Sequence, residues 1–185
     1  MTVATRPAIV AARFTCAKRK VMNEAKPTLF VFCGKPASGK STHARKLSQS
    51  ERTVLIAEDE WLAALFGKEM SSIADFVRCS KKLRDIMGPH IVSVLKAGTS
   101  VVLDFHANTV EARAWMSDIL QKSGANGQLH YFDLPDDVCK ARLRDRNQSG
   151  LHPFQLSEDQ FDQLSRHFVA PSDEEGFLLV VHRVE

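Results

Sequence analysis

The chain has 185 residues, of which 44% are hydrophobic and 25% charged, the balance of one globular domain with a substantial core. No apolar run approaches the ~20 residues that cross a bilayer, so the sequence excludes an integral membrane protein. Four widely spaced cysteines form no CxxC pair, which excludes a zinc ribbon and disfavours a disulfide framework: Cys16, Cys33, Cys79 and Cys139. We therefore expect reduced thiols and a cytoplasmic location.

The formal net charge of +3 is unevenly distributed along the chain. Five of the 25 basic residues and no acidic residue lie within residues 1–21, so residues 22–185 hold 20 basic against 22 acidic side chains, a net charge of −2. A nucleic-acid-binding domain is usually basic. Nucleic acid is therefore a possible partner but not the favoured one, and no membrane partner is expected.

Residues 1–26 form a basic leader without clear periodicity, and the predicted folded domain follows at 27–185. We expect the leader to pack weakly or to be disordered, because termini are poorly ordered unless they are tied down. Met22, which opens a short polar segment before the first apolar run, is an alternative expected start of translation. The rival interpretation is a functional leader, such as a targeting peptide or an anchoring helix.

After Pro27 the pattern of strand, loop and helix repeats. Five short apolar runs predict strands covered on both faces, at 29–33, 54–57, 101–103, 129–132 and 177–181. Helices are predicted between them, at about 42–50, 72–97, 109–123, 136–146 and 157–168. This alternation predicts a three-layer α/β/α fold with a five-stranded, mainly parallel sheet and a small lid.

The long helix at 72–97 is expected to present one apolar face to the core and to kink at Pro89. The residues at helical spacing on that face are Phe76, Leu83, Ile86, His90 and Val94. The seven histidines of the chain show no metal-ligand spacing in the sequence, and no HExxH motif occurs.

The strongest motif is the segment from Gly34 to Ser41, GKPASGKS, which satisfies G-x4-G-K-[ST] in full. It follows an apolar strand and precedes a helical run, the context that a phosphate-binding loop requires. Lys40 is predicted to reach the β- and γ-phosphates of ATP, and Ser41 to ligate Mg²⁺. The alternative is a glycine-rich turn that only connects strand to helix. The expected nucleotide contacts are Gly34, Lys35, Pro36, Ala37, Ser38, Gly39, Lys40, Ser41 and Thr42.

Two carboxylates lie at the carboxyl ends of predicted strands, where open α/β sheets bind ligands. Asp104 follows the apolar run Val101–Leu103 and is a candidate second ligand of Mg²⁺. Asp59 follows the run Val54–Ala57 and is a candidate catalytic base and substrate contact for a hydroxyl-bearing acceptor. The alternative for Asp59 is an N-cap of a helix that begins at Trp61.

Arg142 and Arg146 lie four residues apart and therefore share one helix face. Phosphoryl transfer needs cations around the transferred group, so both are candidate catalytic residues on a helix that leads into a lid. The alternative is a solvated helix face paired by nearby aspartates. Arg144 is expected to face solvent, and Arg113 is a weaker candidate for binding the acceptor.

With these residues in hand, the chain resembles the small P-loop kinases of the zeta-toxin, chloramphenicol-phosphotransferase and polynucleotide-5′-kinase group, within an AAA-like ATP-binding subfamily. The resemblance covers about residues 28–184. It is carried by the ordered set GKPASGKST, VLIAEDEW, VVLDFHANTVEARAW, YFDLPDDVCKARLRDRN and FVAPSDEEGFLLVVH.

The resemblance implies that Asp59 is the acceptor-activating aspartate, and that Arg142 and Arg146 form a lid pair near the adenine and the phosphates. It also implies that Pro171–Gly176 lies beside the nucleotide base. Phe105-His106-Ala107 departs from the small residues that such chains often carry there, so the acceptor is not carried over.

The leading functional hypothesis is an ATP- and Mg²⁺-dependent kinase that phosphorylates a hydroxyl of a small-molecule or nucleotide-like acceptor. One alternative is a polynucleotide 5′-hydroxyl kinase, against which the net charge of residues 22–185 argues. A second is a nucleotide-binding switch with slow ATP hydrolysis and a protein partner.

Overall fold

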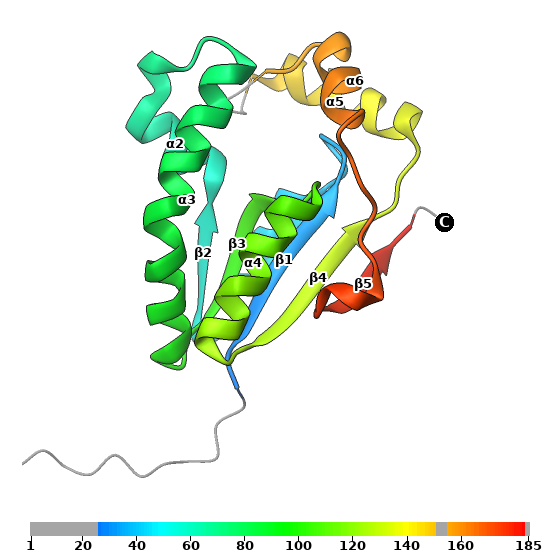
Figure 1. The fold of residues 1–185 in the computed structure, drawn as a ribbon. Coiled ribbons are helices and arrows are strands. Elements are labelled where there is room, and N and C mark those ends of the chain that lie inside the picture. Colours follow the sequence, from blue (N-terminus) through cyan, green and yellow to red (C-terminus); the bar gives the residue numbers. More distant parts are fainter. Residues whose placement is uncertain (1–25, 151–154, 184–185) are drawn as a thin grey trace, which may run out of the picture.

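The computed structural model describes residues 26–150 and 155–183, so the expectations for residues 1–25 lie outside the described residues. Five strands form one sheet in the order β2-β3-β1-β4-β5, and every neighbouring pair is parallel. The strands are β1 (Thr28–Gly34), β2 (Thr53–Ala57), β3 (Ser100–His106), β4 (Asn126–Phe132) and β5 (Leu178–His182). β1 to β4 span their predicted apolar runs and β5 overlaps the fifth, beginning one residue later, so the predicted sheet is confirmed (Figure 1).

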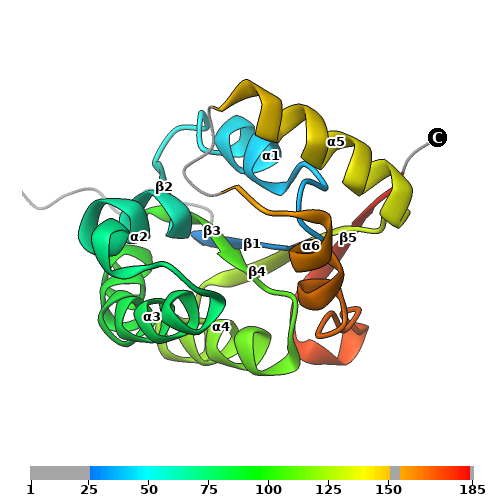
Figure 2. The same cartoon turned by 90° about the horizontal axis from the view of Figure 1, so that it is seen from above.

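Helices cover both faces of this sheet. Helices α1 and α5 lie on one face and α2, α3 and α4 on the other (Figure 2). The helices are α1 (Lys40–Leu47), α2 (Glu58–Phe66), α3 (Ile73–Lys96), α4 (Val110–Ser123), α5 (Asp136–Ser149) and α6 (Glu158–Ser165), with the short 3-10 turns Gly67–Glu69 and Asp173–Glu175. Among these helices even the longest, α3, lacks the continuous apolar length that a bilayer-spanning helix needs.

The core has one large layer and two small ones. The large layer lies between the sheet and helices α3 and α4 and includes Leu29, Ile91 and Met116, all fully buried. A much smaller cluster of Phe32, Ala44 and Val102 holds α1 on the other face. The third cluster joins α5 to α6 and contains Cys139, Leu143 and Phe161. Helix α1 therefore has little apolar anchoring of its own.

The core face of α3 matches the predicted one in part. Its buried hydrophobic residues are Cys79, Leu83, Met87, Ile91 and Leu95. Leu83 is thus confirmed, and Phe76 and Val94 pack partly buried against the core. The prediction is wrong for Ile86, which is 69% exposed, and for His90, which is also exposed. The buried residues repeat at every fourth position, whereas the predicted face mixed spacings of three and four. The helix continues through Pro89 without ending.

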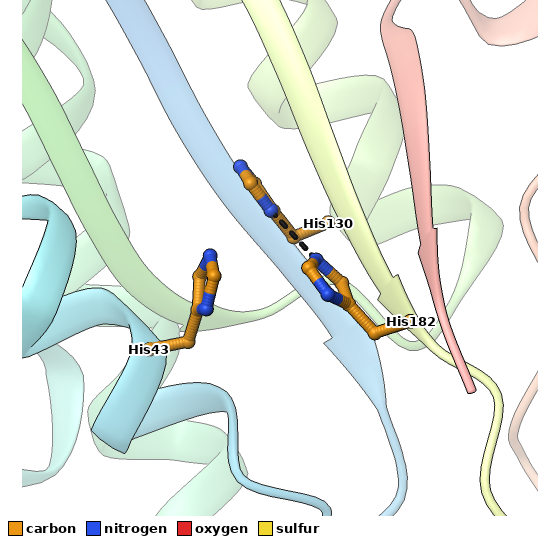
Figure 3. A group of neighbouring side chains, drawn as sticks. All are labelled: His43, His130 and His182. Atoms are coloured by element: carbon orange, nitrogen blue, oxygen red, sulfur yellow. Dashed lines mark hydrogen bonds between the residues drawn. The ribbon is translucent and has the colours of Figure 1, made fainter. Parts of the chain in front are cut away.

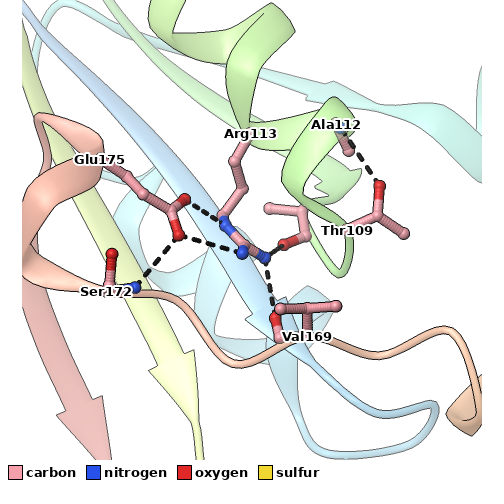
Figure 4. A network of polar contacts seen from close by, with 7 residues as sticks. Thr109, Ala112, Arg113, Val169, Ser172 and Glu175 are labelled. Atoms are coloured by element: carbon pink, nitrogen blue, oxygen red, sulfur yellow. Dashed lines mark hydrogen bonds and ion pairs between the residues drawn. The ribbon is translucent and has the colours of Figure 1, made fainter.

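The surroundings of Arg113 do not favour its predicted role in binding the acceptor. It is 1% exposed and lies on the core side of α4. Its guanidinium donates to both carboxylate oxygens of Glu175 and, through Nη1, to the carbonyl oxygens of Ala107 and Val169 at 2.9 Å each (Figure 4). Four hydrogen bonds thus join α4 to the end of β3 and to the segment before β5, so Arg113 has a structural role.

The first prediction concerns this ion pair. Glu175→Ala leaves the buried guanidinium of Arg113 without its charge partner, and we expect the free energy of unfolding to fall by about 3 kcal/mol. Denaturant unfolding measures it. The matched control is Asp118→Ala, which breaks the exposed pair with Lys122 on the same helix and should cost about 0–1 kcal/mol. Equal effects of the two substitutions would contradict the structural role of Arg113.

Candidate active site

The segment between β1 and α1 is a tight loop bounded by two glycines in left-handed backbone conformations. Gly34 and Gly39 adopt φ values of 153° and 104°, which side chains other than glycine rarely allow. A Cβ on Gly34 would lie 2.8 Å from Ser38 Oγ and 2.9 Å from Phe132 Cβ, so only glycine fits between the loop and β4. The Asn108 side chain accepts a hydrogen bond from the Gly34 amide at 2.9 Å and ties the loop to the end of β3.

Lys40 begins α1 and is 6% exposed. Its ammonium donates to the carbonyl oxygens of Gly34 and Lys35 at 2.7 and 2.8 Å and to Ser38 Oγ at 3.3 Å. Burial lowers the pKa of Lys40 to about 8, while the negative charges of Asp104 and Asp59 act in the opposite direction. The cation is therefore short of solvation, and an anion in the loop would stabilise it.

The two candidate magnesium ligands come together. The Ser41 hydroxyl at the start of α1 donates a hydrogen bond to the carboxylate of Asp104 in β3. Burial raises the pKa of Asp104, while this hydrogen bond and the nearby His106 and Lys40 lower it. A hydroxyl and a carboxylate side by side at a phosphate loop are the oxygen ligands that Mg²⁺ prefers. The donor set fits a magnesium ion, which would neutralise phosphate charge when bound.

Asp59 lines the same cavity as these groups, from the first turn of α2. Helix α2 begins at Glu58, and its N-cap is Ala57, which makes no side-chain cap hydrogen bond. The alternative interpretation of Asp59 as the cap of a helix starting at Trp61 is therefore wrong. Asp59 therefore lies inside the first turn of α2, and it shares the cavity with Lys40 and Asp104, whose pKa values it influences.

Sequence reasoning missed the importance of Glu58, which is 1% exposed. Its Oε1 accepts hydrogen bonds from Ser80 Oγ at 2.5 Å and Arg84 Nη2 at 3.4 Å, and its Oε2 from the His106 amide at 3.4 Å. These contacts fix the start of α2 to α3 and to the end of β3. Since Glu58 is held inward, the adjacent Asp59 is directed along a different side of the helix, toward the cavity. Glu58, Asp59 and Glu60 are three consecutive acidic residues, and nothing in the sequence indicates which of them is buried and which faces the cavity.

Arg142 and Arg146 both reach the cavity from α5. Arg142 donates from Nη1 to the Ser38 carbonyl of the loop at 3.3 Å. Arg146 is more enclosed: its Nε and Nη2 atoms are shielded from solvent and have no hydrogen-bond partner. Burial lowers the pKa of Arg146, and Asp59 opposes that effect. Arg144 is exposed, as expected, and pairs with Glu158 at 2.7 Å.

A single cavity of about 1680 Å³ connects these groups. Its lining includes residues of the phosphate loop, of α1 and the arginines of α5. It also includes residues from α3 and the end of β3, namely Phe76, Lys81, Arg84 and His106. The charged groups Lys40, Asp59 and Arg146 belong to the same lining.

Two further predictions need correction. The Lys35 side chain forms an ion pair with Asp136 and is not part of the cavity lining, so only its backbone belongs to the loop. None of the residues from Pro171 to Gly176 lines the cavity, since this segment instead supplies Glu175 to Arg113.

The second prediction tests the unpaired donors of Arg146. Arg146→Met removes a buried, incompletely paired cation, so we expect the free energy of unfolding to stay the same or rise. The affinity for MgATP or its turnover should nevertheless fall by about 10²-fold, because a cation facing the phosphates is lost.

Calorimetric titration, steady-state turnover and denaturant unfolding measure the three quantities. Arg144→Met on the exposed side of the same helix is the control and should change nucleotide binding by less than about twofold. A variant that loses stability but binds and turns over nucleotide normally would show that Arg146 only supports the fold.

No curated protein is significantly similar to this chain in sequence. Among solved structures, a candidate kinase from Chloroflexus aurantiacus J-10-fl is 20% identical, with a TM-score of 0.67 and 86% of each chain covered. Kti12 of Chaetomium thermophilum, in complex with ADP-AlF3, is 15% identical with a TM-score of 0.61 over 83% of this chain and 88% of that one.

The APS kinase CysC of Mycobacterium tuberculosis, in complex with AMPPNP and APS, is 20% identical with a TM-score of 0.55, covering 85% of this chain and 89% of that one. At these identities the likeness concerns the fold, which is the P-loop α/β/α architecture. The sequence profile of an AAA domain family matches residues 29–171, more than half of the chain. The chain therefore belongs to that AAA domain family.

Proposed function

We propose that this protein is an ATP- and Mg²⁺-dependent phosphotransferase that moves the γ-phosphate to a hydroxyl of a small-molecule or nucleotide-like acceptor. The observation that carries this proposal is the size of the cavity together with its lining. Single-ligand sites occupy about 300–1000 Å³, whereas this cavity measures about 1680 Å³, and its lining extends from the phosphate loop to residues of α3. That volume suits two substrates lying together beside Lys40, Asp59 and Arg146, and a simple nucleotide switch has no use for the additional space.

The proposed roles follow from the positions of the side chains. The loop amides and Lys40 hold the β- and γ-phosphates, Ser41 and Asp104 hold the magnesium ion, and Arg142 and Arg146 face the transferred group. Asp59 accepts the proton of the acceptor hydroxyl. Among the lining residues from α3, the ring of Phe76 favours an acceptor that carries a flat ring. Lys81 and Arg84 also line the cavity, but they already pair with Asp85 and Glu58.

The third prediction concerns Lys40. Lys40→Met removes the cation on the phosphates, and we expect turnover to fall by about 10²–10³-fold, the loss typical of one electrostatic group at a reacting centre. Steady-state turnover of ATP measures it. The protein should remain folded because a neutral side chain replaces a charge whose burial is unfavourable. Turnover within a few-fold of the parent protein would show that this loop is not the catalytic centre.

The fourth prediction concerns Asp59. Asp59→Asn should leave the affinity for MgATP unchanged and slow transfer to the acceptor by about 10²-fold, at the low end for a general base because phosphoryl transfer has a loose transition state. Single-turnover transfer from labelled ATP separates binding from chemistry. Glu60→Gln is the control, since the next carboxylate pairs with Arg45 in an exposed contact. An equal loss in both variants would contradict the role of Asp59.

The acceptor is identified by incubating the protein with γ-labelled ATP, a metabolite extract and 5′-hydroxyl oligonucleotides. Label in a small molecule supports the proposal, label in the oligonucleotide supports the polynucleotide kinase alternative, and label only in free phosphate supports the hydrolytic switch. The Lys40→Met variant shows which label depends on this site.

A further inference from the structure

Three histidines that are far apart in the sequence converge on the sheet face covered by α1. His43 comes from α1, His130 from β4 and His182 from β5, and their rings point toward one another (Figure 3). One ring nitrogen from each lies within 4.8 Å of the others, the one such group of three possible ligands in the part of the chain that the structure describes. The ring centroids of His43 are 4.8 Å from both other rings.

The parallel register of β4 and β5 accounts for the meeting of two of these rings. His130 is paired with Val180, and His182 lies two residues further along β5, so both side chains project from the same face of the sheet. Helix α1 crosses that face and adds His43, two residues after Ser41. The cluster is thus built from three rigid elements.

The hydrogen bonding within this cluster is incomplete. His130 Nδ1 and His182 Nε2 are 2.9 Å apart and share one proton. His130 is 4% exposed, and its Nε2 atom is buried without a partner, as is Nε2 of His43. Whichever tautomer His130 adopts, its Nε2 is either a buried donor without an acceptor or a buried lone pair without a donor. Such unpaired buried groups are rare and call for a missing partner.

A neutral imidazole ligates a metal ion through a free ring nitrogen, and the buried Nε2 atoms of His130 and His43 have no hydrogen-bond partner. Burial, together with the other two histidines, lowers the pKa of His130 to about 4, which agrees with that geometry. Lys46 lies near His43 and repels positive charge there. A metal ion at this position would therefore be held by coordination to the imidazoles, because the surrounding charges do not attract it.

We propose that His43, His130 and His182 form a binding site for one Zn²⁺ ion, separate from the magnesium site at Ser41 and Asp104. Three imidazole nitrogens suit zinc and not magnesium, which prefers oxygen ligands. With zinc–nitrogen distances of about 2.0–2.1 Å, tetrahedral ligands lie about 3.4 Å apart. The most distant nitrogens, within 4.8 Å, need only small side-chain rotations to reach that spacing.

The site is open on one side. His43 and His182 line the large cavity, whereas His130 lies behind them. An ion can therefore enter from the cavity, and its fourth position faces that space, where water or another small ligand completes the coordination. A bound ion joins α1, which carries Lys40 and Ser41, to β4 and to the edge strand β5. This inference does not depend on the proposed phosphotransferase activity.

The competing explanation is simple packing. His182 stacks on Phe132 with ring centroids 4.5 Å apart, and His130 stacks on Phe32 at 5.4 Å. In that case the rings fill the space under α1 as aromatic groups, and metal ions bind only weakly and without stoichiometry.

The test is metal binding to the nucleotide-free chain, treated with a chelator and exchanged into metal-free buffer. Titration with Zn²⁺ should give one ion per chain and raise the melting temperature, and the chelator should reverse both. Co²⁺ should produce the visible absorption bands of a tetrahedral site. X-ray absorption of the parent protein loaded with Zn²⁺ should show a first shell with several imidazoles. This measurement uses only the parent protein and therefore does not depend on whether a variant folds.

Separate His130→Gln and His182→Gln variants should weaken Zn²⁺ binding by more than about tenfold, the smallest loss expected even for a partner outside the ligand set. His90→Gln, on the exposed face of α3, should bind as the parent does. Circular dichroism checks that the variants are folded. The proposal is overturned if the parent protein binds no stoichiometric Zn²⁺, or if the first shell of the bound ion contains few imidazoles. It is also overturned if the folded His130 and His182 variants bind Zn²⁺ as well as the His90 control does.

Discussion

The site depends on cations that the fold removes from water without giving them a full set of anionic partners. The Lys40 ammonium is enclosed by two carbonyls and a hydroxyl, which are neutral groups. Arg146 keeps two shielded nitrogens without hydrogen bonds. Burial of a charge is unfavourable unless it is paired. A polyanion that enters the cavity supplies that pairing, so part of its binding free energy comes from relieving a strain that folding has created.

Arg113 shows what a guanidinium looks like when the fold does complete its pairing. It is more deeply buried than Arg146, yet a carboxylate and two carbonyls take up its donors. Both arginines lie on helices that follow parallel strands, and their hydrogen bonding distinguishes them. The donors of Arg113 are taken up within the fold, whereas two shielded nitrogens of Arg146 have no protein partner.

The sequence predicts those parts of the site that depend on adjacent residues or on the order of strands and helices along the chain. The phosphate loop is recognisable because its glycines, lysine and serine are contiguous and flanked by a strand and a helix. Ser41 and Asp104 meet because β1 and β3 are parallel neighbours, and the carboxyl ends of parallel strands share one edge. Such convergence can be anticipated from the alternating pattern once the strands are identified.

Other contacts leave no local trace. Arg113 and Glu175 are 62 residues apart, and no periodicity indicates that they meet. The sequence pattern placed Ile86 on the core face of α3, whereas Met87 is the residue buried there. Neighbouring residues differ by about 100° around the helix axis, and both of these side chains are apolar, so the pattern alone does not distinguish them. Glu58 and Asp59 are chemically alike in sequence, and only the packing of Ser80, Arg84 and the His106 amide around Glu58 distinguishes them.

The histidines follow the same logic, and they bear on the stability of the phosphate loop. Helix α1 has only eight residues, and its buried apolar contact with the sheet is limited to a cluster around Ala44, Phe32 and Val102. A helix this short is not stable by itself in water, so its position depends on what it contacts. His43 lies on the side of α1 toward β4 and β5, where imidazole rings take the place of aliphatic side chains. The orientation of the residues that begin α1, Lys40 and Ser41, therefore depends on a polar cluster about one turn away. Any partner that completes the bonding of that cluster also fixes the loop.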